Sequence, residues 1–415
     1  MSRTHVIPRR ARRFVAPLAF GVVSVAACGL LVPTLDADAL SSATADPGVT
    51  KRTITVGGIV GSDGASQGAD IGARARFARA NRANGVHGRT IEYLRTEAPS
   101  EAATANAAAM RLANSAFAVV PAIAPSVGAS TLTSAGVPFF GIATSAEWHA
   151  SRTGFSVIGV SGQSATTAVN PGWPVQLRAL LGRPRAATVV PVTDDAQVAA
   201  AFTAPAGKAN IARFRAAGFV VNAPVVLAAT SDLGATARTI TTAAPAPAVA
   251  LVLASVPTTT AFARQLAVAG YTGTVAVSGA VYASSLPSGA NGLTMLVPIA
   301  TVDEATPANR QLAAAVERFA PGTAITPAIA AGYWSADFFV RALASAGATP
   351  TRASLLKALN GAHFTYRVPG TVGRSTWPEM HAQPVPCGSL VQSDGRSWLV
   401  IEPYSCAVTA SSSAK

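Results

Sequence analysis

The sequence contains few side chains that are spaced for catalysis or metal binding. Its five histidines are isolated from one another, and no His-Glu-x-x-His sequence occurs. Ser354 and Lys357 form a Ser-x-x-Lys sequence, which is the nucleophile motif of penicillin-recognising enzymes, but no Ser-Asp-Asn or Lys-Thr-Gly follows it. The pair lies in a leucine-bearing helical stretch, so we interpret the match as a coincidence. The sequence therefore predicts a protein that is not an enzyme and that binds no metal.

His87 lies in the stretch FARANRANGVHGRTIEYL, between a helix-like segment and an alternating segment. Asn84-Gly85 is typical of a helix C-cap, and Gly88 allows a tight reversal before the next strand. A catalytic histidine would need a base or a nucleophile close to it in the fold. The local pattern instead favours a structural turn with His87 at its tip.

Cys387 and Cys406 lie near the C-terminus, without the Cys-x-x-Cys spacing of a metal site. In an oxidising compartment such a pair usually forms a disulfide, which would stabilise the fold by about 3 kcal/mol through loop entropy. We predict a disulfide that holds the C-terminal segment.

The N-terminus indicates export, because the charged residues Arg9–Arg13 precede the apolar run Phe14–Ala27. The sequence Val25-Ala-Ala-Cys28 resembles the bacterial lipobox, whose cysteine carries a diacylglyceryl group. Cleavage after the small residues Ala43–Ala45 is one alternative, and an uncleaved anchor that continues through Leu30–Val32 is another. All three readings place the body of the protein outside the cytoplasm.

The net charge does not indicate a nucleic-acid-binding protein. The formal charge of +13 falls to +8 without the five arginines of the leader: Arg3, Arg9, Arg10, Arg12 and Arg13. The remaining basic residues are scattered, and no basic motif with aromatic residues for base stacking accompanies them. The glycines at 57, 58, 61 and 64 do not form Gly-x-Gly-x-x-Gly, so we predict no dinucleotide cofactor.

Strand-like and helix-like segments alternate along the chain after residue 52. In the first series, predicted strands cover 53–60, 89–95, 117–121 and 137–142, and predicted helices cover 69–84, 101–114 and 126–134. In the second, predicted strands cover 186–191, 219–227, 249–253 and 274–278. Predicted helices cover 199–217, with an interruption at Pro205, 235–242 and 259–269. Three further helices are predicted at 307–319, 327–345 and 351–359. This alternation predicts an α/β fold of two Rossmann-like lobes with parallel sheets.

Four passages resemble the type I periplasmic-binding-fold solute receptors, in the leucine/isoleucine/valine-binding branch that serves ABC importers. They are residues 54–60 with the loop GSDGASQG, then ANRANGVHGRTIEYL, then FAVVPAIAPSVGASTLTSAGVPFFGIATSAEW, and finally AAGYWSADFFVRALASAGATPTRASLLKAL. The second passage is the most distinctive, because it is similar to the family's helix-turn-strand sequence that ends in Gly-Arg. The resemblance covers about residues 53 to 359.

This resemblance implies two lobes, each built from discontinuous segments and joined by a three-strand hinge. We expect the following organisation: an export signal with lipobox at 1–28, a flexible tether at 29–51, an N-terminal lobe at 52–158 and 285–370, a C-terminal lobe at 159–284 and 371–406, and a flexible tail at 407–415. In the family, ligand binds between the lobes and favours the closed form, which the permease recognises.

In doubly wound sheets, ligands bind beyond the carboxyl ends of the strands. Ser126 follows the third predicted strand, Ile142 ends the fourth, and Thr144 and Ser145 follow it. The resemblance implies that hydroxyls and backbone groups at matching positions grip a ligand carboxylate. Ser126 and Ser145 could equally serve as helix N-caps.

The second lobe departs from the family pattern. Amino-acid binders of this family hold the ligand ammonium with aromatic and acidic residues there, whereas the corresponding loops read VTDDAQVAAAF, ASVPTTTAF and SGAVYASSL. Asp194, Asp195, Gln197 and Tyr282 could substitute, and we take Gln197 and Tyr282 as candidate ligand contacts. An α-amino acid ligand is therefore not implied.

Taken together, the residues and the resemblance predict an exported, lipid-anchored monomer. It would bind a small polar or amphipathic solute, amino-acid-like or related, in a cleft between the lobes and deliver it to an ABC permease. Two alternatives are a ligand-sensing receptor without transport and an exported enzyme.

Overall fold

The computed structural model describes residues 46–143, 146–148, 151–160, 169–183, 186–203, 207–279, 282, 291–361 and 364–407. Within these ranges, no helix is long and apolar enough to cross a membrane. Cys28, which we predict to be lipidated, and the predicted ligand contacts Thr144 and Ser145 lie outside the described residues.

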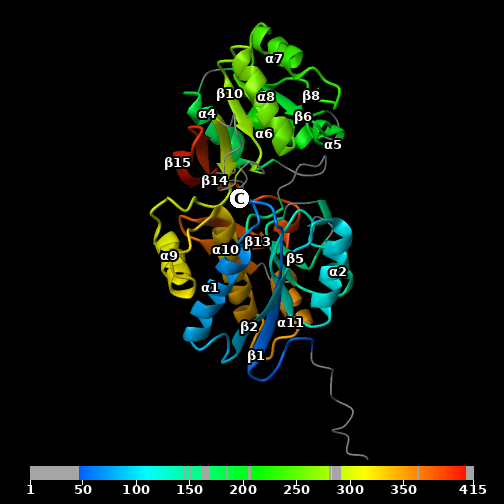
Figure 1. The fold of residues 1–415 in the computed structure, drawn as a ribbon, viewed down its shortest axis with the longest axis vertical. Coiled ribbons are helices and arrows are strands. Elements are labelled where there is room, and N and C mark those ends of the chain that lie inside the picture. Colours follow the sequence, from blue (N-terminus) through cyan, green and yellow to red (C-terminus); the bar gives the residue numbers. More distant parts are fainter. Residues whose placement is uncertain are drawn as a thin grey trace, which may run out of the picture. The chain divides into compact units, whose positions relative to one another are not determined.

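The first sheet contains five strands in the order β2-β1-β3-β4-β5, all parallel to their neighbours. Figure 1 labels its strands β1, β2 and β5. Their bounds are β1 Thr53–Val60, β2 Thr90–Glu97, β3 Ala118–Ile123, β4 Phe139–Gly141 and β5 Gly154–Ser156. The central strand β3 is buried throughout. This burial on both faces is typical of a parallel sheet that is covered by helices on each side.

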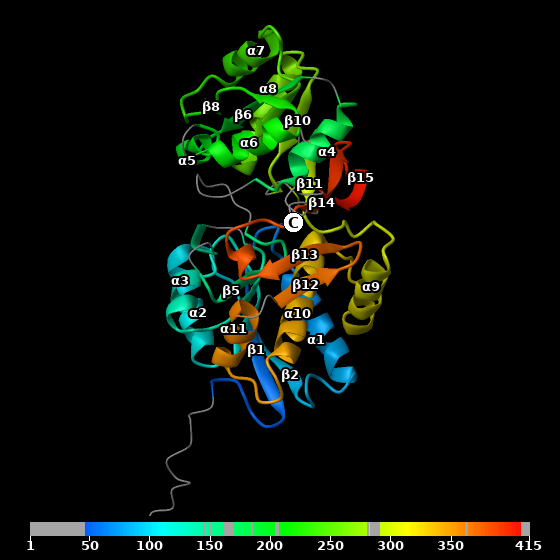
Figure 2. The ribbon, with the colours of Figure 1, turned by 180° about the vertical axis from the view of Figure 1, so that it is seen from behind.

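Helices cover both faces of this first sheet, and alternate residues of the strands point to each. One face packs against α1 (Ala69–Arg82), α9 (Pro307–Phe319), α10 (Pro327–Ser345) and α11 (Arg352–Gly361). The other face packs against α2 (Ala102–Ala113) and α3 (Ala129–Ser134), which lie side by side (Figure 2). The later helices α9 to α11 thus complete a lobe that begins with the strands and helices from β1 to β5.

Helices α1 and α10 approach closely, since glycines lie at their contact. A Cβ atom on Gly72 would lie 1.9 Å from Ile329 O, and one on Gly332 would lie 1.8 Å from Ala69 O. Neither backbone can yield without moving its helix. The contact therefore requires glycine on both helices.

We expect Gly332→Ala to lower the free energy of unfolding by about 1–3 kcal/mol, because overpacking would force α1 and α10 apart. Chemical denaturation measures this change. Gly361→Ala is the matched control, since its Cβ would meet only Lys357 Cγ at 3.9 Å. Equal stabilities of the two variants would contradict the close contact.

The second sheet is mixed, whereas the alternating pattern predicts purely parallel sheets. Its path runs β15-β14-β11-β10-β9-β6-β7, with β8 also paired to β6. The bounds are β6 Ala187–Thr193, β7 Phe219–Val221, β8 Val225–Val226, β9 Val249–Val252, β10 Thr274–Val277, β11 Leu293–Val297, β14 Cys387–Ser393 and β15 Trp398–Cys406. Strand β14 runs antiparallel to both β11 and β15. A hairpin joins β14 to β15, so that pair needs no crossover helix.

Helices also cover both faces of the second sheet. One face packs against α7 (Leu233–Thr242) and α8 (Val256–Val268). The other packs against α4 (Gly172–Leu180), α5 (Ala196–Ala200) and α6 (Lys208–Ala216). The helix predicted at 199–217, with an interruption at Pro205, is thus two helices, α5 and α6.

The chain passes between the two sheets three times, as the three-strand hinge requires. The connecting segments follow β5, β11 and the short 3-10 helix η4 (Glu379–His381). Strand β11 pairs with β10, which moves the boundary expected at 285 to after β11. The hairpin of β12 (Phe364–Val368) and β13 (Val372–Trp377) packs in the first core, which moves the boundary expected at 371 to after η4.

The expected tether is shorter than predicted. Val49 forms a bridge with Ile54 and packs against the first core, and the Asp46 carboxylate accepts a hydrogen bond from Arg352 N. The folded domain therefore begins by Asp46 rather than at residue 52.

His87 is a turn residue. Its φ is 49°, it lies within the Val86–Arg89 bridge, and its Nε2 lies 2.8 Å from Ala344 O in the last turn of α10. A carbonyl only accepts, so Nε2–H donates this hydrogen bond. The histidine thus ties the turn to α10, and the prediction of a structural turn is confirmed.

Candidate ligand-binding site

The predicted ligand contacts of the first lobe lie where β3 and β4 end. Ser126 is half-buried, three residues beyond β3, and Ile142 directly follows β4 and is also half-buried. Ile142 N donates a hydrogen bond to Ala122 O, so the ends of the two strands are held together. The topology therefore brings these two predicted residues to the same edge of the sheet.

The Ser126 hydroxyl already has a partner that the sequence did not indicate. Its Oγ lies 3.5 Å from Glu147 Oε1, and Ala129 N donates to Glu147 Oε2 at 3.0 Å. Glu147 belongs to the 3-10 helix η2 (Ala146–Trp148) and is exposed. Ser126 is thus not the N-cap of α3, because Gly128 occupies that position.

In the second lobe, Asp194 follows β6 and fixes the start of α8. Both of its oxygens accept from Ser255 N, and Ser255 Oγ donates to Asp194 Oδ2 at 2.6 Å. Partial burial favours a higher pKa, but the hydrogen bonds from Ser255 and Thr258 outweigh it and hold the pKa of Asp194 below its ordinary value. Asp194 therefore presents a charged carboxylate beyond the carboxyl ends of β6 and β9.

The neighbouring candidates differ in what they can offer. The Asp195 side chain caps α5 by accepting from Gln197 N and Val198 N, so it has a structural role. The Gln197 side chain is exposed in the first turn of α5. Of these two residues, only Gln197 presents a side chain that the local structure does not use.

Tyr282 is half-buried in the second core. Its ring lies 6.0 Å from that of Trp398 in an edge-to-face arrangement. Burial, together with the charges of Asp303 and Glu304, raises the pKa of the Tyr282 hydroxyl well above its ordinary value. The phenol therefore stays neutral and its ring serves packing.

Glu304 lies in the second connecting segment and fixes that segment to the second sheet. Its Oε1 accepts from Thr301 N and Ser389 Oγ, and its Oε2 accepts from Tyr404 N at 2.7 Å. These bonds join a residue between β11 and α9 to both β14 and β15. The hinge segments are therefore coupled at their second-lobe end.

His381 is the last residue of η4, directly before the third connecting segment, and is 3 % exposed. Asn360 Nδ2 donates to Arg152 O, which leaves Asn360 Oδ1 to accept from His381 Nε2 at 2.7 Å. The ring also packs against Phe155 and Trp377. Burial, with a smaller effect of the Arg152 charge, lowers the pKa of His381 from 6.5 to about 4.

This shift predicts acid sensitivity. Between pH 6.5 and 4 the unfolded chain binds a proton that the folded protein excludes, so the stability that His381 provides is complete above pH 6.5 and falls toward pH 4. When the pH falls from 7 to 5, the free energy of unfolding of the natural protein should decrease by about 2 kcal/mol more than that of the His381→Gln variant. Urea titrations at both pH values measure this, and identical pH dependence would contradict it.

Two serine motifs can be assessed from their surroundings. The residues Gly64-Ala-Ser-Gln-Gly68 after β1 match Gly-x-Ser-x-Gly, the pattern of a hydrolase nucleophile elbow. However, Ser66 is 5 % exposed, and its Oγ donates to Asp63 Oδ2 rather than to a histidine. This serine stabilises the turn before α1.

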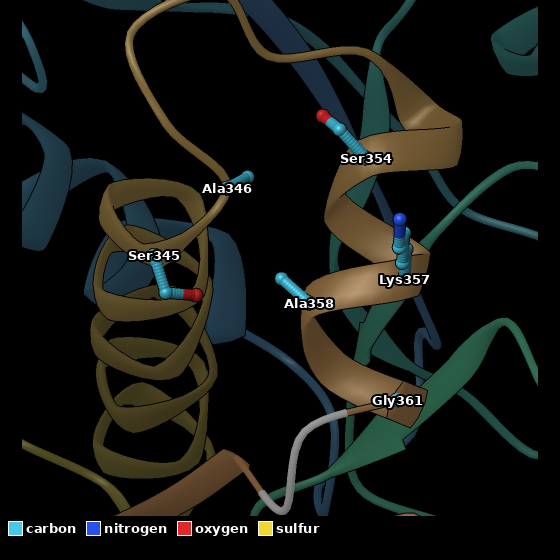
Figure 3. A pocket seen from close by; sticks show the side chains of 6 residues that line it. All are labelled: Ser345, Ala346, Ser354, Lys357, Ala358 and Gly361. Carbon is cyan, nitrogen blue, oxygen red and sulfur yellow. The ribbon is translucent and has the colours of Figure 1, made fainter.

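The second motif lines an open pocket between α10 and α11 (Figure 3). The lining residues are Ser345, Ala346, Ser354, Lys357, Ala358 and Gly361. Ser354 exchanges hydrogen bonds with Thr351, because its Oγ accepts from Thr351 N and its own N donates to Thr351 Oγ1. Ser354 therefore caps α11, which accounts for the Ser-x-x-Lys sequence without catalysis.

Within the described ranges, no three side chains of His, Cys, Asp or Glu gather as a metal site. The predicted disulfide is confirmed, since Cys387 and Cys406 face each other across β14 and β15 and are bonded.

A family model described as periplasmic binding protein matches residues 53–397. The chain belongs to this family of periplasmic binding proteins. Membership confirms that the protein is a solute-binding protein and not an enzyme. A search of curated protein sequences found no match.

Several solved structures of the family share the fold at low sequence identity. A fatty acid ABC transporter substrate-binding protein from Thermomonospora curvata has a TM-score of 0.65 and 16 % identity, over 88 % of this chain and 95 % of that one. An ABC transporter substrate-binding protein from Desulfitobacterium hafniense, in complex with Leu, has a TM-score of 0.64 and 17 % identity, over 84 % and 100 %. One from Aeropyrum pernix has a TM-score of 0.60 and 14 % identity, over 86 % and 96 %. At such identities, these likenesses confirm the predicted type I fold.

Proposed function

We propose that this periplasmic binding protein is the extracytoplasmic solute-binding component of an ABC importer. It would bind a small polar or amphipathic solute beyond the carboxyl ends of the strands of its two sheets. The observation that carries this proposal is the family match over residues 53–397, together with two sheets linked by three connecting segments. The titles of similar structures name ABC transporters, with leucine and fatty acids among the solutes.

Solute binding would shift the two lobes toward a closed form. A ligand can favour that form only by as much as it binds it more tightly than the open one. The contacts of Glu304 support this role, since they fix the second-lobe end of the second connecting segment to β14 and β15. The permease would then recognise the closed form.

The composition of the candidate site supports a solute different from a simple α-amino acid. Ser126 and Ile142 offer one hydroxyl and one apolar side chain, and the described second-lobe residues offer Asp194 and Gln197 without an exposed aromatic ring among them. A solute with both an apolar and a polar part fits these groups. Ser126, Ile142, Thr144, Ser145, Gln197 and Tyr282 remain the proposed contacts.

The proposed location is the outer face of the cytoplasmic membrane, with Cys28 as the lipid-bearing residue. The export signal of the sequence supports this location, as does the disulfide, because disulfides persist in oxidising compartments. Secretion after cleavage and an uncleaved N-terminal anchor are the alternatives.

Combining Ser126→Ala with Thr144→Val should weaken solute binding by at least about 1 kcal/mol for each buried hydrogen bond that is lost. Isothermal titration with the solute that accompanies the natively purified protein measures the change. Thr188→Val, at the second residue of β6, is a control that should bind normally. Unchanged affinity of the double variant would remove these residues from the site.

Measuring solute uptake by cells distinguishes an import function from a sensing function. Cells that lack this gene should lose most high-affinity uptake of the bound solute, and the natural gene should restore it. Normal uptake with an altered transcriptional response would instead favour a ligand-sensing receptor.

A further inference from the structure

The carboxylate of Glu147 accepts hydrogen bonds from two donors that lie just beyond β3. It lies 3.0 Å from Ala129 N and 3.5 Å from Ser126 Oγ. These are a backbone N–H and a hydroxyl at the carboxyl edge of the first sheet, the kind of donors that the family resemblance implies for a ligand carboxylate. An acidic side chain of the protein itself thus fills the place that a ligand acid would need.

Glu147 remains available to a ligand. It is exposed, and among the described residues it forms no ion pair with a lysine or arginine. A carboxylate can accept about four hydrogen bonds, and Glu147 accepts two from described residues. The oxygens therefore keep acceptor capacity on their solvent side, together with a negative charge that no lysine or arginine in the described ranges pairs with.

A second carboxylate of the same kind lies in the other lobe. Asp194 is exposed, and its bonds with Ser255 and Thr258 keep it charged beyond β6. The carboxyl ends of both sheets thus present a negative charge, although the chain as a whole is strongly basic. An anionic solute group beside either residue would meet repulsion between like charges.

We propose that Glu147 is a specificity-determining residue that selects a hydrogen-bond-donating solute group, an ammonium or an amide, and rejects a carboxylate. This inference rests on the proposed function and narrows its solute class. A donor group can bridge the free lone pairs of Glu147 and gain a charge-assisted hydrogen bond, whereas a carboxylate would have to displace Glu147 from Ala129 N and Ser126.

Leucinamide and leucine test this selectivity, because they share one side chain and one ammonium and differ in the carboxylate. Isothermal titration of the natural full-length protein should show leucinamide binding at least about tenfold more tightly than leucine. Glu147→Gln keeps an oxygen that can accept from Ala129 N but loses the charge, so the preference should shrink by about tenfold or more. Glu92→Gln, an exposed charge change in the middle of β2, should keep the natural preference.

Three results would overturn the proposal: leucine binding as tightly as leucinamide, a preference that Glu147→Gln leaves unchanged, or no leucinamide binding at about 10 mM. The proposed function fails separately. The protein could be purified with a solute that carries a free carboxylate and whose uptake requires this gene. That result would support the proposed function and contradict the role of Glu147.

Discussion

Replacing Asp337 with alanine should lower the free energy of unfolding by about 3–5 kcal/mol, the usual cost of removing one partner of a buried ion pair. Asp337 is 4 % exposed, on α10. Its oxygens lie 2.7 Å from Arg76 Nε and 2.9 Å from Arg341 Nε, and Tyr366 Oη donates to Oδ2 at 3.2 Å. Truncation leaves the mostly buried Arg76 charge and a fully buried phenol without this partner.

The matched control is Glu97→Ala, which removes a surface pair. Glu97 contacts Arg95 and Arg111, whose side chains are 47 % and 51 % exposed. Exposed pairs contribute about 0–1 kcal/mol, so this variant should be nearly as stable as the natural protein. Urea unfolding followed by circular dichroism compares the two, and similar losses from both variants would contradict the buried network.

Removing the disulfide should cost about 3 kcal/mol of stability, because the bond closes a loop between residues 19 apart in sequence. The change is the double substitution Cys387→Ser with Cys406→Ser. Cys387 is 2 % exposed at the start of β14, and the bond fastens β14 to the edge strand β15. The natural protein should lose a similar amount in a reducing buffer, because the same constraint on the unfolded chain disappears.

The double serine variant supplies the control, since the reducing agent should not change its stability. A natural protein that is equally stable with and without reductant, while its thiols react with a thiol reagent after reduction, would contradict the stabilising role of the bond.

Local sequence patterns predicted most helices of the first lobe closely. The bounds of α9 and α10 agree with the predicted ranges, because each begins with a threonine N-cap followed by proline. Strand β1 also has its predicted range, since a β-branched apolar run predicts a buried strand. These features depend on residues close together in the chain.

Pairing between distant segments could not be predicted in the same way. The sequence of β11 is compatible with a place in either sheet, and its pairing with β10 and β14 assigns it to the second sheet. The β12–β13 hairpin packs into the first core although it follows all the predicted helices. Sequence spacing carries no information on which sheet such strands join.

The candidate site shows the same division. The end of β3 follows from the pattern, which placed Ser126 correctly at a strand edge. The contacts of Glu147 with Ser126 and Ala129 join residues about 20 positions apart in the sequence, so they depend on the path of the chain between β3 and η2. A carboxylate three residues beyond Thr144 was visible in the sequence, but its hydrogen-bond partners were not.

We propose above all that this chain binds a small solute reversibly, beyond the carboxyl ends of the strands of its two sheets. The most direct measurement is to purify the exported protein without denaturation, release what it carries, identify it by mass spectrometry, and titrate it back by calorimetry. The account predicts saturable binding of one solute per chain and a melting temperature that rises with solute concentration, as binding to the folded state alone requires. A protein that carries no solute, and whose melting temperature no candidate solute raises, would contradict it.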